Sequence, residues 1–359
     1  MRKEVFRILV LNPGSTSTKA AVYDDVEEIA NATLHYTDEQ LETCGGVLGQ
    51  EEMRMKDVMY MLEENHVPAK SLNAVVGRGG LLNPIDSGTY LINDRMLDDL
   101  RNEKAMVHAS SLGGVIAHDI GKRWGIPAYI VDPVVVDELE PYARFSGIPE
   151  IERRSVFHAL NSKAVARHCA EKIGISYENG RFIVAHMGGG VTIGAHRYGR
   201  VIDVNDAVSG DGPFTPDRSG SVPVKPMVEL CFSGKYTKDE ILDKVIGKGG
   251  MKAYLGVNDM REVEIKVKNG DEHAAMVMEA MAFQISKQIG AMAAVLEGRV
   301  NAIILTGGLA HSQRFVGLIK QRVSQFASVY TFPGEAEMLA LAEGALRVLR
   351  GEEPPAIYQ

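Results

Sequence analysis

Three glycine-bearing turns in the sequence have the composition of phosphate-binding sites. Residues 12–19 combine hydroxyl side chains with Gly14 and end at the cation of Lys19, residues 186–192 contain three consecutive glycines, and residues 306–311 contain two. Crowded backbone amides and hydroxyls can cradle phosphate oxygens, and glycine lets a ligand approach the backbone closely. The first turn lacks the Walker spacing, so a polar hairpin tip is its alternative. A tight hairpin without a ligand is the alternative for the second.

Each turn follows a short apolar run that predicts a strand. An offset of 174 residues places Ile8 on Phe182 and Gly14 on Gly188, which indicates a duplicated domain unless two hairpins coincide by chance. Helical periodicity predicts helices over residues 50–64, 111–123, 159–173, 272–296 and 335–350. Further strands are expected at 74–76, 128–131 and 329–332, and an irregular tail from Glu352. We interpret the methionines of 272–296 as core residues. The class is α/β.

Composition narrows the possible functions. A formal net charge of -8 over 359 residues disfavours the broad basic surface that a nucleic acid requires. The three cysteines, Cys44, Cys169 and Cys231, lie far apart, so no disulfide framework or zinc site is predicted. No apolar run approaches the roughly 18 residues of a membrane span. We therefore expect a cytoplasmic protein that binds neither nucleic acid nor membrane.

Taken together, the three turns resemble those of the sugar kinase, Hsp70 and actin superfamily, in which ATP lies in a cleft between two like domains. In order and spacing, these turns and the segments 153–158 and 218–221 resemble the acetate and butyrate kinase family over nearly the whole chain. The butyrate kinases are most similar at 77–80, 132–138 and 210–216. The resemblance implies two duplicated ribonuclease H-like domains with an ATP cleft between them. Their expected bounds are 1–145 plus 338–359, and 146–337.

The same resemblance implies roles for individual residues. Arg218 would contact the transferring phosphoryl group, with a plain loop arginine as the alternative. Arg78 would bind the carboxylate, although acetate kinases carry that arginine three residues earlier. Guanidinium groups suit both tasks because they can grip oxyanions through two hydrogen bonds. Asp132 would orient an arginine or the metal complex, with Asp137 or a turn-capping role as alternatives. The implied catalytic residues are Arg78, Asp132, His158 and Arg218.

Nucleotide and metal sites are implied in the same way. Mg²⁺ would be positioned by Glu337, with Glu335 or ordinary helix N-terminal charge as alternatives. The residues implied for ATP or ADP are Asn12, Gly14, Ser15, Thr16, Ser17, Lys19, His186, Gly188, Gly189, Gly190, Asn258, Asp259, Arg261, Gly307, Gly308 and His311.

The size of the acid is predicted from Gly77, which stands where acetate kinases carry a valine. A missing side chain would make room for further carbons, each contributing about 0.8 kcal/mol when buried. Val107, His108 and Phe157 would complete this pocket, and a structural role is equally open for His108. The predicted reaction is butyrate + ATP = butyryl phosphate + ADP by direct in-line transfer, in a homo-oligomer. The alternatives are a kinase for isobutyrate and a non-catalytic ATP-driven switch of the Hsp70 kind.

Overall fold

The computed structural model describes residues 5–102 and 108–359, and the chain divides into two compact units. The first unit comprises Met1–Val136 with Ala336–Gln359, and the second comprises Asp137–Glu335. The sequence placed these boundaries after residues 145 and 337. The structure therefore assigns Glu337 to the first unit, whereas the sequence assigned it to the second.

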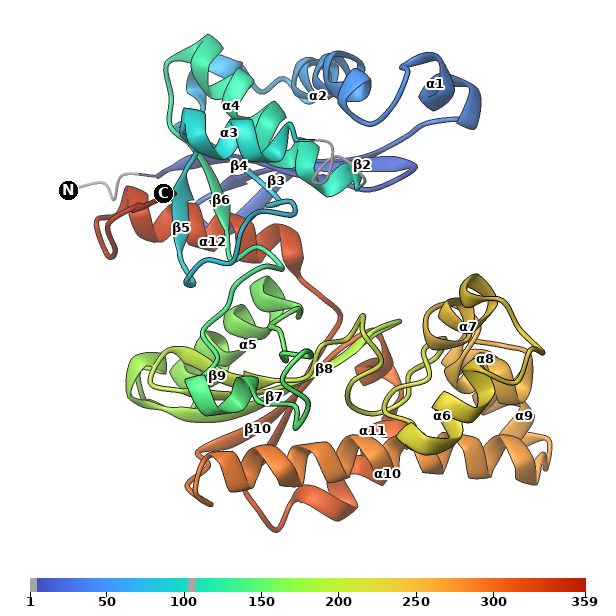
Figure 1. Cartoon of the computed structure of the whole chain (residues 1–359). Coiled ribbons are helices and arrows are strands. Elements are labelled where there is room, and N and C mark those ends of the chain that lie inside the picture. The colour runs from blue at the N-terminus through green and yellow to red at the C-terminus, as the bar shows by residue number, and fades with distance from the viewer. Residues whose placement is uncertain (1–4, 103–107) are drawn as a thin grey trace. The chain divides into compact units, whose positions relative to one another are not determined.

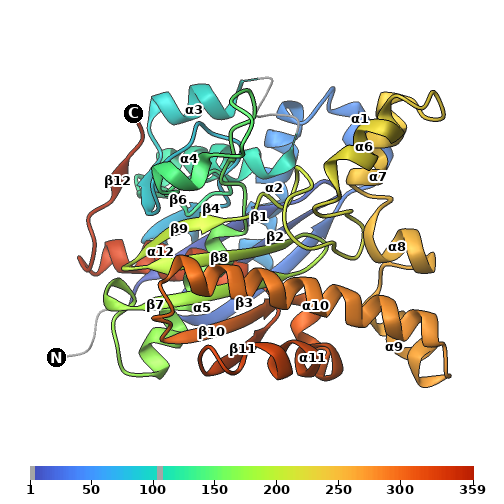
Figure 2. The ribbon, with the colours of Figure 1, turned by 60° about the horizontal axis from the view of Figure 1, so that its bottom comes forward.

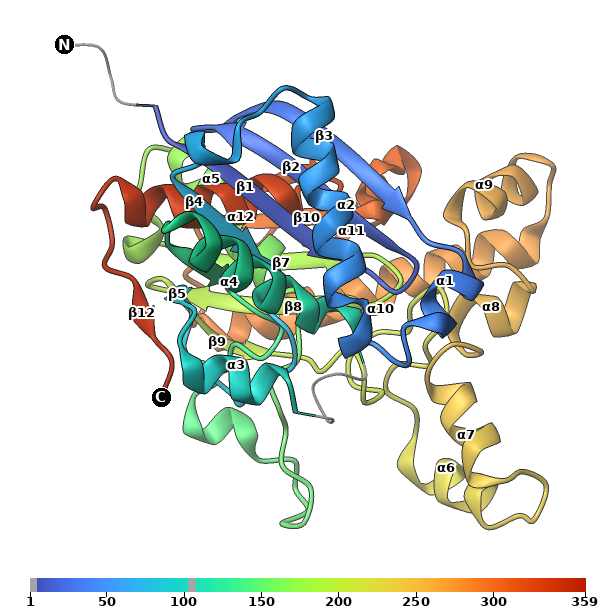
Figure 3. The ribbon, with the colours of Figure 1, turned by 90° about the horizontal axis from the view of Figure 1, so that it is seen from above.

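The first unit is a mixed sheet with helices on both faces (Figure 1). Its strands lie in the order β12-β5-β6-β4-β1-β2-β3. Figure 3 shows α2 and α4 over one face of this sheet, and Figure 1 shows α12 on the other. Its elements are β1 (Arg7–Pro13), β2 (Ser17–Asp24), β3 (Glu27–His35), α1 (Asp38–Thr43), α2 (Glu51–Glu64), β4 (Ala74–Gly77), β5 (Thr89–Leu91), α3 (Asp94–Leu100), α4 (Leu112–Trp124), β6 (Ala128–Val131), α12 (Glu337–Leu349) and β12 (Ala356–Ile357).

The second unit repeats this plan around a sheet in the order β11-β10-β7-β8-β9. Alternate residues of its central strand pack on opposite faces: Ile183 and Ala185 contact the core under α10 and α11, while Phe182 and Val184 contact α5. Figure 2 shows α10 lying along this sheet. The elements are α5 (Ala159–Lys172), β7 (Arg181–Met187), β8 (Val191–Arg197), β9 (Arg200–Val204), α6 (Val224–Cys231), α7 (Lys238–Val245), α8 (Gly250–Leu255), α9 (Met260–Lys268), α10 (Glu272–Val295), β10 (Ala302–Gly307), α11 (Gln313–Val323) and β11 (Val329–Pro333).

The topology confirms the duplication predicted from the 174-residue offset. The succession β6-β4-β1-β2-β3 in one sheet matches β11-β10-β7-β8-β9 in the other. In both sheets the first strand of the hairpin pairs antiparallel with the second and parallel with a later strand. A register shift interrupts the next pairing at Val22/Tyr23 in one copy and at Ala195/His196 in the other.

Two local predictions hold only in part. Met278, Met281 and Met292 of α10 are buried as predicted, whereas Met276 is 69% exposed. The tail is not irregular throughout, because Ala356–Ile357 forms strand β12 and pairs parallel with β5. Tyr358 is 2% exposed, and its hydroxyl donates to Asp99 Oδ2 over 2.7 Å.

The predicted helices and strands otherwise form with ends that shift by at most two residues. Within the described ranges, none of the helices has the length and apolar content that crossing a bilayer requires.

Candidate functional site

The first predicted phosphate turn is the β1–β2 hairpin of the first unit. The N–H of Gly14 donates to the carbonyl of Ser17 over 2.7 Å and closes the turn. Ser15, Thr16 and Lys19 are exposed around it. The hydroxyls and the cation predicted to contact phosphate therefore lie at the surface of one hairpin.

Arg78, Asn12 and Glu337 form a hydrogen-bonded trio in the first unit. Arg78 Nη1 donates to Glu337 Oε2 over 2.8 Å and to Asn12 Oδ1 over 3.3 Å, and Asn12 Nδ2 donates to Glu337 Oε2 over 2.9 Å. Glu337 is the first residue of α12, where the helix dipole favours a negative charge. The carboxylate bonded to Arg78 is thus Glu337, the residue that the resemblance assigned to Mg²⁺.

Gly77 has no open space beside it, which overturns the pocket argument. A Cβ built on Gly77 would lie 2.0 Å from the carbonyl oxygen of Gly113 in α4. One on Gly79 would meet Pro133 at 2.6 Å, and one on Gly80 would meet Ser111 Oγ at 2.2 Å. These glycines let the end of β4 pass between the start of α4 and the end of β6. The glycine at this position is a packing requirement, and the absence of its side chain leaves no room for further carbons.

The acidic residues after β6 have structural partners. Asp132, at a φ of 38°, accepts hydrogen bonds from Ser87 Oγ (2.6 Å) and the N–H of Gly88 (2.9 Å). These bonds correspond to the turn-capping role, which was the alternative for this residue. Asp137 forms a two-pronged ion pair with Arg144 at 2.8 and 2.7 Å.

The remaining predicted substrate-pocket residues fall in different places. His108 caps the turn 109–111 through Ser110, whose N–H donates to His108 Nδ1 over 3.2 Å. Phe157 is 3% exposed in the second unit. Val107 lies outside the described residues.

Two predicted histidines meet at the second hairpin, between β7 and β8. The rings of His158 and His186 stack with centroids 3.8 Å apart. His158 Nδ1 contacts Thr192 Oγ1 at 3.1 Å. A Cβ on Gly188 would lie 3.5 Å from His186 Nε2, so this nitrogen lies beside the glycine turn.

Asn161 orients His186, and the sequence reasoning missed it. Asn161 Nδ2 donates to the carbonyl of Glu335, and its Oδ1 faces His186 Nδ1 at 2.8 Å. A carbonyl only accepts hydrogen bonds, so the amide orientation is fixed and His186 Nδ1 must carry the proton. Its Nε2 then lies 3.7 Å from Glu335 Oε1. The signal available in the sequence was an asparagine one turn after His158.

Arg218 lies against the same glycine turn. A Cβ on Gly190 would be 2.9 Å from Arg218 Nη1, and this nitrogen donates to the carbonyl of Ala207 over 2.6 Å. Thr215 Oγ1 donates to the carbonyl of Gly189 over 2.7 Å and accepts from the N–H of Arg218 over 3.1 Å. Arg218 Nε is buried with no hydrogen-bond partner among the described residues. Asp217 Oδ1 lies 3.8 Å from this nitrogen, beyond hydrogen-bond distance. A buried donor that still lacks a hydrogen bond, held over a glycine turn, suits an oxyanion ligand.

A cavity of about 610 Å³ in the second unit opens beside this turn. It brings together seven of the residues implied for nucleotide binding, from three separate segments. Hydrogen bonds from Arg261 lower the pKa of the Asp259 carboxyl at its rim. The cavity is lined by Gly188, Gly189, Pro216, Asp217, Asn258, Asp259, Met260, Arg261, Glu264, Gly308, Leu309, His311 and Ser312.

Gly307 is needed where β10 passes β7. Its φ is 86°, and a Cβ there would lie 2.5 Å from the carbonyl oxygen of Met187. This close approach holds the third turn against the end of the second hairpin's first strand.

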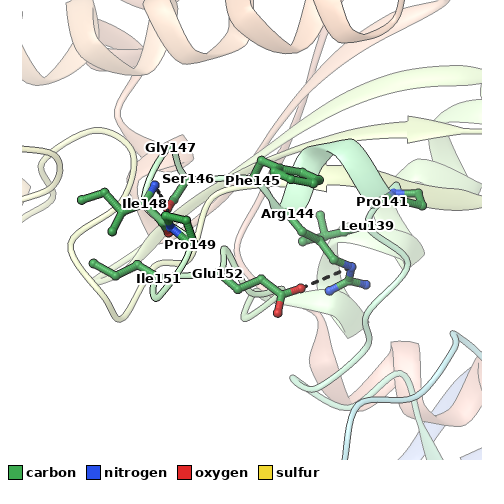
Figure 4. A pocket seen from close by; sticks show the side chains of 10 residues that line it. All are labelled: Leu139, Pro141, Arg144, Phe145, Ser146, Gly147, Ile148, Pro149, Ile151 and Glu152. Atoms are coloured by element: carbon green, nitrogen blue, oxygen red, sulfur yellow. Dashed lines mark hydrogen bonds and ion pairs between the residues drawn. The ribbon is translucent and has the colours of Figure 1, made fainter.

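A second cavity of similar volume, about 610 Å³, contains none of the predicted site residues (Figure 4). Its lining is mostly apolar, from Leu139 to Ile151, with Arg144 and Glu152 facing each other at 4.0 Å.

The residues predicted to bind magnesium fit an ion that takes a single protein carboxylate. In the described part of the chain, no group of three or more His, Cys, Asp or Glu is arranged to hold a metal. Mg²⁺ commonly uses one or two carboxylates and completes its shell with water and phosphate oxygens. Glu337, or Glu335 in the other unit, offers such a single carboxylate.

Comparison with known proteins identifies relatives of this arrangement. A family model described as the acetokinase family matches residues 147–342, more than half of the chain. The crystal structure of Porphyromonas gingivalis acetate kinase is similar with a TM-score of 0.79 at 19% identity, covering 96% of this chain and 100% of that one. A propionate kinase from Francisella tularensis gives 0.74 at 19% identity, with 94% and 98% covered. The ROK hexokinase from Thermus thermophilus gives 0.50 at 13% identity, with 94% and 98% covered. At these identities the structural matches show the fold, which is the two-unit α/β fold predicted from the three turns.

Proposed function

We propose that this chain, which belongs to the acetokinase family, transfers the γ-phosphoryl group of ATP to a short-chain carboxylate. The observation that carries the proposal is the cluster on the second hairpin. Arg218 is held over Gly190, and His186 lies beside Gly188, where the turn lines a cavity of about 610 Å³. This arrangement offers cationic and hydrogen-bonding groups to a polyphosphate whose nucleoside occupies the cavity.

The chemistry requires two anions to meet. An arginine can offset the charge that develops on the transferring phosphoryl group, and a second can hold the acceptor carboxylate in line. We assign the first task to Arg218 and His158, and the second to Arg78. Arg78 Nη1 is held by Glu337 Oε2 at 2.8 Å, which restricts the guanidinium to one orientation. Mg²⁺, when bound with the nucleotide, would neutralise phosphate charge, with Glu337 as the protein carboxylate nearest to Arg78.

Butyrate is the proposed acid, and this choice rests on similarity to butyrate kinases at 77–80, 132–138 and 210–216. The space beside Gly77 no longer supports it, because the backbone of Gly113 fills that space. Acetate and propionate are the acids named for two of the similar structures, and isobutyrate is the branched alternative. We further propose a cytoplasmic homo-oligomer, which light scattering of the purified chain would test.

The first experiment measures acyl phosphate trapped with hydroxylamine, from MgATP and a panel of acetate, propionate, butyrate, isobutyrate and valerate. We expect product with a maximum at butyrate. A maximum at another acid would keep the reaction and reject the assigned substrate. Tight ATP binding with no product from any acid would favour the switch-protein alternative.

Arg218→Ala tests the mechanism. Turnover should fall at least about a hundredfold, the scale of one lost transition-state contact, with ADP affinity largely kept. Arg299→Ala is the matched control, since that side chain is 74% exposed and pairs only loosely with Glu297 at 4.0 Å. Near-normal turnover of Arg218→Ala would remove this residue from the mechanism.

A further inference from the structure

Arg54 of α2 lies completely buried behind the first hairpin. Its side chain is 0% exposed, although the helix belongs to the outer layer of the first unit (Figure 3). Nη1 donates to the carbonyl of Ser17 over 3.0 Å and to Thr18 Oγ1 over 2.8 Å. Nη2 donates to the carbonyl of Ser15 over 3.1 Å. The guanidinium thus holds two carbonyls of the turn from inside the protein.

The rest of the guanidinium is also satisfied. Nε and Nη2 both donate to Gln50 Oε1, over 3.1 and 2.8 Å. The group lies 4.6 Å from the ring centroid of Tyr36. With these bonds, all five N–H donors of Arg54 have acceptors.

Every one of these acceptors is neutral. In the described ranges, no carboxylate oxygen lies within the 4.0 Å of an ion pair with Arg54. Burial lowers the pKa of the Arg54 guanidinium, yet an arginine remains charged at neutral pH. The first unit therefore contains a buried positive charge that forms no ion pair with the described carboxylates.

The third carbonyl of the turn also has a partner in the protein. The N–H of Tyr36 donates to the carbonyl of Thr16 over 3.0 Å. Hence the carbonyls of Ser15, Thr16 and Ser17 are all bonded to the protein, two of them by Arg54. With these carbonyls bonded to the protein, the turn presents to a ligand the exposed hydroxyls of Ser15 and Thr16 and its backbone amides, except the N–H of Gly14 that closes the turn.

We infer that Arg54 is a positioning residue for phosphate binding at the first hairpin. It orients the turn through Ser15 and Ser17 and keeps a buried positive charge behind it. Burying a charge without a counter-charge is costly, and a phosphate on the outer side of the turn would offset that cost. This inference rests on the proposed function for the identity of the ligand, MgATP.

The experiment compares Arg54→Met, which removes the charge and the donors, with Arg54→Lys, which keeps the charge. Lys56→Met is the matched control, because Lys56 is exposed on the same helix. KM for MgATP and kcat are measured by acyl phosphate formation. We expect Arg54→Met to raise KM about tenfold with kcat nearly unchanged, as for binding lost equally in the ground and transition states. Arg54→Lys should recover most of this loss. The loss should persist at high salt, because buried charges are poorly screened.

MgATP affinity measured by calorimetry separates this inference from the proposed reaction. If the wild type makes no acyl phosphate but Arg54→Met still loses MgATP affinity, the kinase proposal fails and the role of Arg54 stands. The role of Arg54 is overturned if Arg54→Met binds MgATP like the wild type. It is also overturned if Arg54→Lys binds no better than Arg54→Met, since the charge would then contribute nothing.

Discussion

Replacing Gly77 by alanine should separate β4 from α4. A Cβ on Gly77 would lie 2.0 Å from the carbonyl oxygen of Gly113, while ordinary contact begins at 3.4 Å, so strand and helix must move apart by the difference of 1.4 Å. Both contacting groups are backbone in regular elements, and neither can rotate away. We expect a cost of about 3 kcal/mol, at the upper end of the usual range for overpacking.

The same displacement should reach the carboxylate site, because Arg78 follows Gly77 directly. A misplacement of about 1 Å can cost a hundredfold in rate, so kcat/KM for the acid should fall about a hundredfold. Thermal unfolding followed by circular dichroism should show a midpoint lower by roughly 6–12 °C, since 1 kcal/mol corresponds to about 2–4 °C in a domain of this size.

Gly317→Ala is the control for this prediction. Gly317 is inside α11, and a Cβ added there would have nothing within 4 Å, so alanine at this position should stabilise the helix by about 0.5–1 kcal/mol. The packing argument is refuted if Gly77→Ala keeps its midpoint and activity. It is refuted more directly if Gly77→Val folds and shifts its preference to acetate, because that outcome requires an open pocket at this position.

Three further predictions concern residues outside the turns. Burial and a neighbouring carboxylate raise the pKa of Glu51 to about 7 from 4.5, so its contribution to stability is complete below about pH 4.5 and is lost as the pH rises through 7. Glu51→Gln should flatten the pH dependence of the unfolding midpoint between these values, and an unchanged pH profile would contradict the assignment. Lys163 is 1% exposed and pairs with Glu138 at 2.8 Å, so Lys163→Met should lower the free energy of unfolding in urea by about 3–5 kcal/mol. Adding Glu138→Gln should recover part of this loss, and no recovery would argue against an unpaired buried charge as its cause. Asn161→Ala should remove the acceptor that fixes the proton on Nδ1 of His186. A change of tautomer would appear in the ¹⁵N NMR spectrum of this ring, with the ring of His196 as the unchanged reference, and an unaltered His186 spectrum would reject the role of Asn161.

Much of the fold could be predicted because local patterns report it directly. The 3.6-residue periodicity of residues 50–64 and 272–296 gave α2 and α10 almost to the residue. The 174-residue offset between the first two turns predicted the duplicated topology, since similar segments at a fixed offset are the sequence signature of a repeated structural unit. The exposed part of α10 was misjudged because apolar composition alone does not say which face meets a neighbour.

The candidate site also contains residues that the sequence predicted and residues that only the tertiary structure placed. Residue types and spacing along the chain singled out the glycine turns, since these are short segments whose composition is itself the signal. Arg218 and the two stacked histidines were predicted only from the resemblance to the acetate and butyrate kinase family. Only the tertiary structure could pair Arg78 with Glu337, 259 positions apart, or place Arg54 behind the first hairpin. It also reversed the meaning of Gly77, because an absent side chain looks the same in sequence whether a ligand or a helix backbone occupies the space. Contacts between distant segments depend on packing, and packing is the information that one sequence read along its length does not carry.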